Sequence, residues 1–121
     1  SKKINESSLF TIGGHSMYHN IFSTMTISEQ YKEIIVSIEM LKCNLGSFSG
    51  HYAYPEGQNC HFNSDTISLM KDCGVVCCPS AINGYASIED QHLYNLKRTM
   101  VGIDTSANRL ISEFTNKHNC L

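Results

Sequence analysis

The chain has 121 residues, of which 41% are hydrophobic and 17% are charged, so it suits one folded domain rather than a disordered segment. The net charge of −2, without a basic stripe, argues against nucleic acid as the main partner. No apolar run approaches the roughly 20 residues of a membrane-spanning helix, and residues 1–7 lack the apolar stretch of a signal peptide.

The first predicted element is a strand over residues 8–13, which ends at a pair of glycines, Gly13 and Gly14. Two histidines then follow four positions apart, His15 and His19. If both lie on one helical turn, their side chains share a face and both imidazoles can reach one Zn²⁺ ion at about 2.0–2.1 Å. A histidine pair at this spacing is also common on surfaces and at helix caps, so the spacing alone leaves both interpretations open.

The clearest helix is predicted to begin after Thr26, because Thr26 and Glu29 have the spacing of a capping box. It is predicted to end before Gly46, since glycine commonly terminates helices in the left-handed conformation. Apolar residues recur at helical spacing and predict one buried face, made of Ile27, Tyr31, Ile34, Ile35, Ile38, Leu41 and Leu45.

A second strand is predicted over residues 50–54, where it ends at Pro55. A shorter helix is predicted from residue 64 to residue 73, capped at its start by Asn63 or Ser64. The next apolar run, residues 75–78, is typical of a strand that is buried on both faces.

The rest of the chain is less regular. Residues 92–101 contain apolar side chains in a pattern that leaves helix and strand both open. A last helix is predicted to begin near Asp104 or Thr105 and to bury Leu110, Ile111 and Phe114. The alternation of strands and helices predicts an α/β fold with parallel strands and right-handed crossovers, in a single domain over residues 1–121.

Six cysteines are many for this length, yet none forms a Cys-x-x-Cys pair, and Cys77 and Cys78 lie in the predicted buried strand. We interpret them as reduced thiols in the core, in preference to a disulfide framework. Reduced thiols are typical of a reducing compartment, so the sequence predicts a cytoplasmic protein.

Three clusters follow the predicted strands at their C-terminal ends, where parallel α/β folds place their sites. Residues 13–19 resemble the His-Ser/Thr-x-x-His metal motif of the polysaccharide deacetylases, the NodB-homology or carbohydrate esterase family 4 group. Residues 52–57 are similar to the third motif of that family in its Tyr-Pro-x-Gly form, and residues 96–98 resemble its Arg-bearing segment. The resemblance covers roughly residues 8–102, with the motifs in the right order.

This resemblance implies a partial distorted (β/α) barrel of NodB type and a metal-dependent deacetylase of acetylated amino sugars or polysaccharides. It implies that His15 and His19 bind a divalent metal, expected to be zinc, together with an aspartate from an earlier strand. Such a metal would polarise the acetyl carbonyl and acidify the attacking water.

Four further residues receive roles from the same resemblance. The resemblance implies that the backbone N–H of Glu56 would help to bind the oxyanion, and the Glu56 carboxylate could replace the base that the family supplies from another motif. Arg98 could orient a carboxylate partner, while Tyr54 and Pro55 would contact the substrate. Each side-chain role has a structural alternative: an exposed turn residue for Glu56, a surface cation for Arg98 and core packing for Tyr54.

The departures from the family pattern concern the catalytic carboxylates. No aspartate precedes His15, whereas the first family motif, Thr-Phe-Asp-Asp-Gly, supplies both the base and the third ligand. Ala53 stands where many members carry Arg, and Glu56 where many carry Tyr. We therefore expect the C-terminal part of a deacetylase domain, without its N-terminal strands and inactive alone.

Two consequences follow from an incomplete domain. The alternative to a deacetylase is a non-catalytic module of degenerate deacetylase fold that binds a sugar or a protein partner. A partial barrel also exposes sheet edges and apolar surface, which predicts a homo-oligomer or association with the missing N-terminal part.

Overall fold

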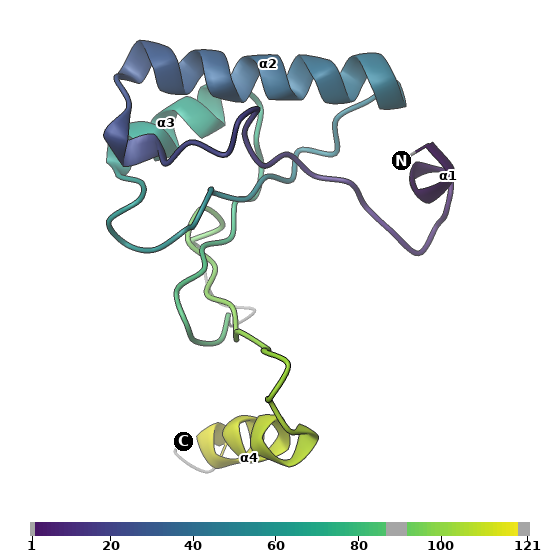
Figure 1. The fold of residues 1–121 in the computed structure, drawn as a ribbon, viewed down its shortest axis with the longest axis vertical. Helices are drawn as coiled ribbons and strands as arrows, with labels where there is room; N and C mark the ends of the chain where they lie inside the picture. Colours follow the sequence, from purple (N-terminus) through teal and green to yellow (C-terminus); the bar gives the residue numbers. More distant parts are fainter. Residues whose placement is uncertain (1, 87–91, 119–121) are drawn as a thin grey trace.

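The computed structural model describes residues 2–86 and 92–118, and the regular elements within these ranges are helices (Figure 1). In chain order they are α1 (Lys2–Asn5), the 3-10 helix η1 (Phe22–Thr24), α2 (Ile27–Leu45), α3 (Ser64–Asp72) and α4 (Ala107–His118). The predicted strands over residues 8–13, 50–54 and 75–78 do not form as strands in the described part of the chain. The (β/α) barrel therefore stays a prediction.

Parallel pairing nevertheless links the three segments that were predicted as strands. Isolated parallel bridges join Gly14 to Tyr52 and His51 to Cys77. The Gly14 N–H donates to the His51 carbonyl, and the Ala53 N–H donates to the Gly14 carbonyl, each at 2.9 Å. The predicted parallel direction is thus confirmed for these segments, although each bridge is isolated.

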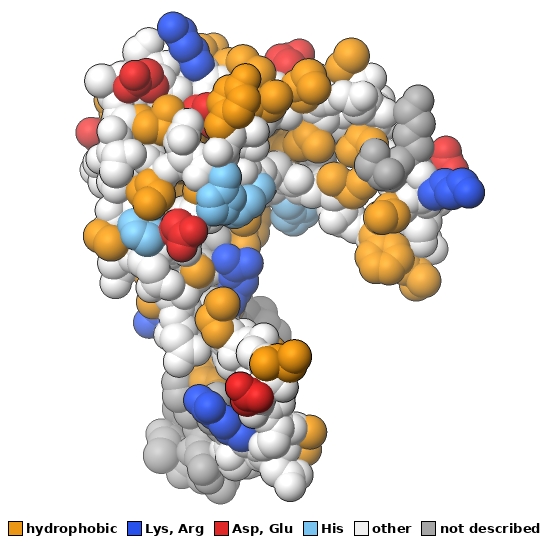
Figure 2. All heavy atoms as spheres, viewed as in Figure 1, with side chains coloured by type: hydrophobic (Ala, Val, Ile, Leu, Met, Phe, Trp, Pro, Cys, Tyr) orange, Lys and Arg blue, Asp and Glu red, His pale blue; other side chains and the backbone are white. Residues whose placement is uncertain are grey.

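The predicted strand over residues 8–13 does not form, because the backbone there has few hydrogen-bonding partners on neighbouring segments. Leu9 is 83% exposed and Phe10 is 61% exposed, and hydrophobic side chains stand at the surface of this N-terminal arm (Figure 2). The predicted double-sided burial of residues 75–78 is also wrong, because Val76 is 54% exposed. A strand needs hydrogen-bonding partners along its length, and a short apolar run does not guarantee them.

Helix α2 has the predicted boundaries but a different buried face. Thr26 and Glu29 form the capping box, and Gly46 takes a left-handed φ of 84° at the C-cap. Ile27 and Tyr31, two members of the predicted apolar stripe, are each 46% exposed. The buried positions are instead Gln30, Glu33, Ile34, Ser37 and Ile38.

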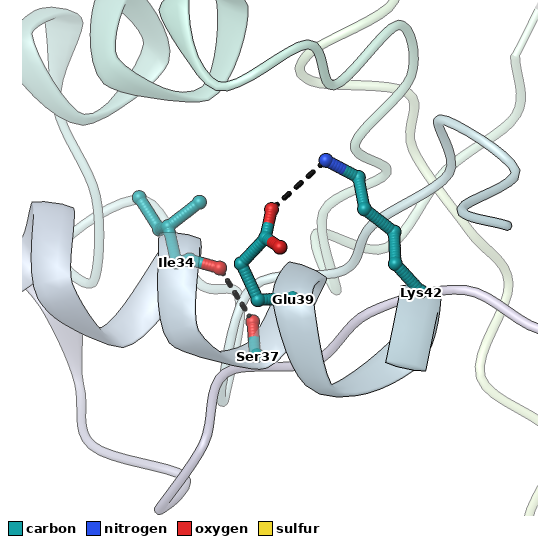
Figure 3. A network of polar contacts seen from close by, with 4 residues as sticks. All are labelled: Ile34, Ser37, Glu39 and Lys42. Atoms are coloured by element: carbon teal, nitrogen blue, oxygen red, sulfur yellow. Dashed lines mark hydrogen bonds and ion pairs between the residues drawn. The ribbon is translucent and has the colours of Figure 1, made fainter. Parts of the chain in front are cut away.

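Helix α2 carries buried polar residues and exposed polar residues, which make different contacts (Figure 3). Ser37 is buried, and its hydroxyl donates to the Ile34 carbonyl at 2.8 Å. Glu39 and Lys42 form an exposed ion pair at 2.9 Å. The inner polar residues therefore belong to the core, while the outer pair is a solvated surface contact.

Helix α3 confirms the second predicted helix and packs on α2. Asn63 caps it through its side-chain oxygen, which accepts from the N–H groups of Asp65 and Thr66. The buried Thr66 hydroxyl lies 2.9 Å from the Gln30 side-chain oxygen and donates to it. The buried hydrophobic residues around this contact form the core: Phe22, Ile34, Ile38, Tyr52, Tyr54, Phe62, Met70, Val75 and Cys78.

Residues 92–101 form neither helix nor strand and run beside residues 78–82. The Cys78 N–H donates to the Leu93 carbonyl at 2.9 Å, and the Arg98 N–H donates to the Ile82 carbonyl at 3.1 Å. Through these hydrogen bonds, residues 92–98 lie beside residues 78–82, next to the segments joined by the parallel bridges.

Helix α4 lies apart from α2 and α3 at the end of an extended segment (Figure 1). Its predicted burial is wrong for Ile111, which is 59% exposed, while Leu110 is half-buried. The side chain of Phe114 lies outside the described part of the structure. A helix without a neighbour has no surface against which to bury its apolar residues.

The five described cysteines are free, but the predicted core location holds fully for Cys78 alone. Burial raises the pKa of the Cys78 thiol to about 12, so it stays protonated at neutral pH. Cys43 and Cys60 are exposed, and Cys120 lies outside the described residues. Among the described helices, none has the length and apolar character required to cross a membrane.

Candidate functional site

The two histidines of the predicted metal pair lie together on the loop formed by residues 14–20. Their ring centroids are 4.8 Å apart, with an interplanar angle of 69°. The two histidines do not share a helical turn, the arrangement considered from their spacing, because Ser16 and His19 take left-handed φ values of 59° and 60°. The Ser16 hydroxyl accepts from the His19 N–H at 2.8 Å, so a tight turn rather than a helix brings the rings together.

His15 is oriented by the neighbouring segment. Its Nδ1 lies 3.0 Å from the Ala53 carbonyl oxygen. Because a carbonyl only accepts hydrogen bonds, Nδ1 carries a proton, so in the neutral imidazole the lone pair lies on Nε2. Histidines that bind metals commonly have their other ring nitrogen held in this way. Both histidines are exposed, and histidine side chains are visible at the surface in Figure 2.

The start of the loop is fixed by a close contact between Gly14 and Tyr52. A Cβ added at Gly14 would lie 2.3 Å from a ring carbon of Tyr52, so only glycine fits here. The Tyr52 phenol accepts from the Ser16 N–H at 2.8 Å. It also donates to the Ser37 oxygen at 2.7 Å, because the Ser37 hydrogen is already directed at the Ile34 carbonyl. Burial raises the pKa of Tyr52 to about 12, so the phenol keeps this proton at neutral pH.

The middle of the loop is held by Glu33 of α2, which is only 7% exposed. Its Oε2 accepts from the backbone N–H of Met17 at 3.0 Å and from that of Tyr18 at 3.1 Å. The side-chain amide of Asn20 donates to Oε1 at 3.5 Å. One buried carboxylate therefore satisfies three donors of the loop.

Sequence reasoning missed Glu33, Ser37 and Tyr52 as residues of the site. The available signal was the spacing of Gln30, Glu33 and Ser37. Glu33 follows Gln30 by three positions and Ser37 follows Glu33 by four, as residues on one helical face do. Polar side chains on a face that also carries Ile34 indicate buried polar partners. The identity of those partners depends on the fold and could not be read from the helix alone.

Tyr54 and Pro55, predicted to contact substrate, are buried. Tyr54 is 1% exposed, stacks on Phe62 with ring centroids 4.0 Å apart, and donates to the Tyr94 carbonyl at 2.9 Å. Burial raises the pKa of its phenol well above the usual value. These contacts favour the core-packing alternative for Tyr54, and a role for Pro55 in substrate contact stays a prediction.

Glu56 stands at a tight turn beyond Ala53. It is exposed and has a left-handed φ of 58°. Gly57 follows with a φ of 67°, and a Cβ there would lie 2.8 Å from the Ala81 nitrogen. Within the described ranges the Glu56 backbone N–H makes no hydrogen bond, so it is available as a donor.

Arg98 lies beside the segment that follows Cys78. Its Nε donates to the Ser80 carbonyl at 2.6 Å. Within residues 2–86 and 92–118, no carboxylate forms an ion pair with Arg98. Its predicted role in orienting a carboxylate therefore stays a prediction.

Two imidazoles do not complete a metal site. Across residues 2–86 and 92–118, no cluster of three or more histidine, cysteine, aspartate or glutamate side chains is placed to hold a metal ion. Zinc sites in proteins generally use at least three protein ligands. The chemistry of His15 and His19 fits two nitrogen ligands, and the third ligand is not found among the described residues.

A largely apolar cleft of about 360 Å³ opens between α2 and the start of the histidine loop. Its lining includes the backbone of Gly13 and Gly14 together with the side chains of Ile12, Met17, Met40, Leu41 and Leu45. His15 and Ser16 also line it, so the cleft adjoins the first histidine of the pair.

A family model described as polysaccharide deacetylase matches residues 1–78. No curated protein sequence matches the chain. Among solved structures, the Streptococcus pyogenes deacetylase PplD in complex with acetate superposes with a TM-score of 0.72 and 21% identity, covering 81% of this chain and 42% of that one. A de-N-acetylase from Aggregatibacter actinomycetemcomitans gives a TM-score of 0.59 at 16% identity, covering 71% of this chain and 31% of that one. The chain thus spans less than half the length of either structure, and the likeness is one of fold.

Proposed function

The chain belongs to the polysaccharide deacetylase family, and from this premise we propose that it supplies the histidine pair of a metal-dependent deacetylase. The proposed substrates are N- or O-acetylated amino sugars or polysaccharides. The observation that carries the proposal is the placement of His15 and His19, whose rings lie 4.8 Å apart on a loop held by buried polar groups. The Ala53 carbonyl leaves Nε2 of His15 with a free lone pair, as a metal ligand requires.

We propose that His15 and His19 hold a divalent metal, with zinc favoured because it binds imidazole nitrogen well. When bound, such an ion polarises a carbonyl and lowers the pKa of a water molecule. The third ligand would come from a carboxylate outside the described residues, which the fold of a longer deacetylase domain would bring beside His15.

The remaining roles belong to residues around the turn beyond Ala53. The Glu56 backbone N–H would donate to the oxyanion that develops on the acetyl group. The Glu56 carboxylate is exposed and is the proposed proton acceptor. Arg98 would orient a carboxylate of the complete domain through the guanidinium nitrogens that do not contact Ser80.

We propose that the parallel segments form part of a distorted (β/α) barrel of NodB type. The parallel bridges at Gly14 and His51 support this arrangement, since the intervening segments contain α2 and α3. Residues 1–121 would then be one incomplete domain, inactive until the missing metal ligand is supplied.

A non-catalytic module that binds a sugar or a partner is the second candidate. It is favoured by the incomplete ligand set around His15 and His19. Both candidates share the deacetylase fold, and they differ in whether acetate is released from an acetylated sugar.

Calorimetric titration with Zn²⁺ tests the metal pair. We expect the wild-type chain to bind zinc, and His15→Ala and His19→Ala to abolish the binding because each removes one of two nitrogen ligands. His92→Ala is the matched control, since His92 is an exposed histidine on another segment. Absence of zinc uptake by the wild-type chain would count against the proposal.

Acetate release distinguishes the two candidates. An N-acetylglucosamine oligomer incubated with zinc and the polypeptide that contains the whole domain should yield acetate, and the yield should disappear in His15→Ala. Binding of the oligomer without acetate release would instead support the non-catalytic module.

A further inference from the structure

We propose that Glu33 is a positioning residue that sets the metal affinity of the histidine pair through the loop backbone, without binding the metal itself. The inference rests on the proposed function, because it concerns the same two histidines. It is carried by the hydrogen bonds of one buried carboxylate and by the backbone conformation of the loop that it holds.

The hydrogen bonds fall between the two histidines. Met17 and Tyr18 lie in the sequence between His15 and His19, and both direct their N–H groups at Glu33 Oε2, at 3.0 and 3.1 Å. Successive backbone N–H groups that converge on one anion form a nest, and hydrogen bonds to a carboxylate are roughly twice as strong as neutral ones. Glu33 thereby fastens the middle of the loop to α2.

The loop benefits from such an anchor because two of its residues take backbone conformations that side-chain-bearing residues rarely adopt. Ser16 and His19 both have left-handed φ values, which residues with a Cβ adopt only when the surroundings hold them there. Regular hydrogen bonding to the neighbouring segment ends at Gly14. Without the carboxylate, the Ser16–His19 hydrogen bond would remain, but the middle of the loop would lose its attachment to α2 and the two rings would be held less firmly relative to each other.

Glu33 itself is badly placed to act as a ligand. Its side chain is 7% exposed, and its two oxygens face the N–H groups of Met17 and Tyr18 and the amide of Asn20. The described residues also contain no group of three ligands that would include it with the histidines. Its effect on the metal must therefore pass through the loop.

Glu33→Gln tests this role because it keeps the shape of the side chain and removes its charge. We expect the variant to unfold at the wild-type temperature within a few degrees and to bind Zn²⁺ about tenfold to hundredfold more weakly, as loss of a supporting contact around metal ligands commonly does. Glu39→Gln is the matched control, since Glu39 is an exposed carboxylate on the same helix. It should bind zinc with wild-type affinity.

The outcomes separate this inference from the proposed function. Zinc binding by the wild-type chain with unchanged affinity in folded Glu33→Gln would overturn the inference alone. No zinc binding by the wild-type chain would overturn the proposed function, and the metal role of Glu33 with it.

Hydrogen exchange of the wild-type chain keeps the inference testable if Glu33→Gln does not fold. The amides of Met17 and Tyr18 should exchange much more slowly than unbonded loop amides, because both donate to Glu33. Exchange at the rate of an unbonded amide would overturn the inference whatever the variant does.

Discussion

The two imidazoles of the site are placed by different kinds of contact. His15 is held through its ring by the Ala53 carbonyl, whereas His19 is held through its backbone by the Ser16 hydroxyl. Tyr52 links these contacts to the core, because its phenol reaches both the Ser16 N–H and the buried Ser37. At the scale of single residues, the site thus depends on buried side chains that are not themselves ligands.

Tyr52→Phe should lower the free energy of unfolding by about 1–3 kcal/mol, because the Ser16 N–H loses its acceptor and the buried Ser37 oxygen loses its donor. Urea denaturation measures this change. Tyr18→Phe is the matched control, since Tyr18 is 74% exposed and should change the free energy by less than about 0.5 kcal/mol. Equal stability of the two variants would contradict the bridging role of Tyr52.

At the scale of elements, the ends of α2 and the start of α3 were predictable and the strands were not. Helix α4 begins at Ala107 and not near Asp104 or Thr105, and α1 was not predicted. The caps at Thr26 and Asn63 depend on residues within three positions, so the local sequence contains all the information. The extent of a strand depends on neighbours far away in the chain, and residues 8–13 lack them over most of their length. Glu33 was missed for the same reason, because its partners lie 13 to 16 residues before it in a loop.

The pairing of the two histidines was predictable from the sequence, whereas the residues that support them were not; their role as metal ligands stays a prediction. His15 and His19 were identified from their spacing and motif, and the fold does bring their rings together. The rings are brought together by a tight turn and not by a helix, since Ser16 and His19 adopt left-handed backbone conformations that no helical pattern indicates. Burial of Tyr54 also depends on Phe62 and on the Tyr94 carbonyl, which only the fold brings near.

Thr26→Ala should destabilise the chain by about 0.5–2 kcal/mol, because it removes the side chain that caps α2. Thermal or urea unfolding followed by circular dichroism gives the value. Ser28→Ala in the same first turn is the control, since Ser28 is exposed and alanine is a better helix former. A Thr26→Ala variant as stable as Ser28→Ala would show that the cap contributes nothing.

At the scale of the whole molecule, the chain leaves much apolar surface uncovered. Leu9, Phe10, Met100 and Val101 are each more than 60% exposed, and Ile103 is fully exposed. Soluble monomers rarely expose large contiguous apolar patches, and uncovered ones commonly mark interaction surfaces. Ile12, which lines the apolar cleft beside α2, follows Leu9 and Phe10 closely in the sequence.

We expect the chain to self-associate, because association would cover this surface. Light scattering over a range of concentrations should give a mass above 13.5 kDa, the mass of one chain. The double variant Leu9→Ser/Phe10→Ser should shift the distribution toward the monomer, whereas Lys42→Ser, which changes an exposed polar position, should not. A monodisperse monomer at high concentration would contradict the expectation.

The contact between His15 and Ala53 has a consequence for how this site can drift over evolutionary time. Every amino acid at position 53 would present the same main-chain oxygen, so the protonation of the His15 ring does not constrain the identity of that residue. Alanine in place of the arginine found in many deacetylases therefore leaves the orientation of the imidazole untouched. Substitutions here can alter what the side chain of residue 53 contacts, while the orientation of the His15 ring is still set by the main-chain oxygen.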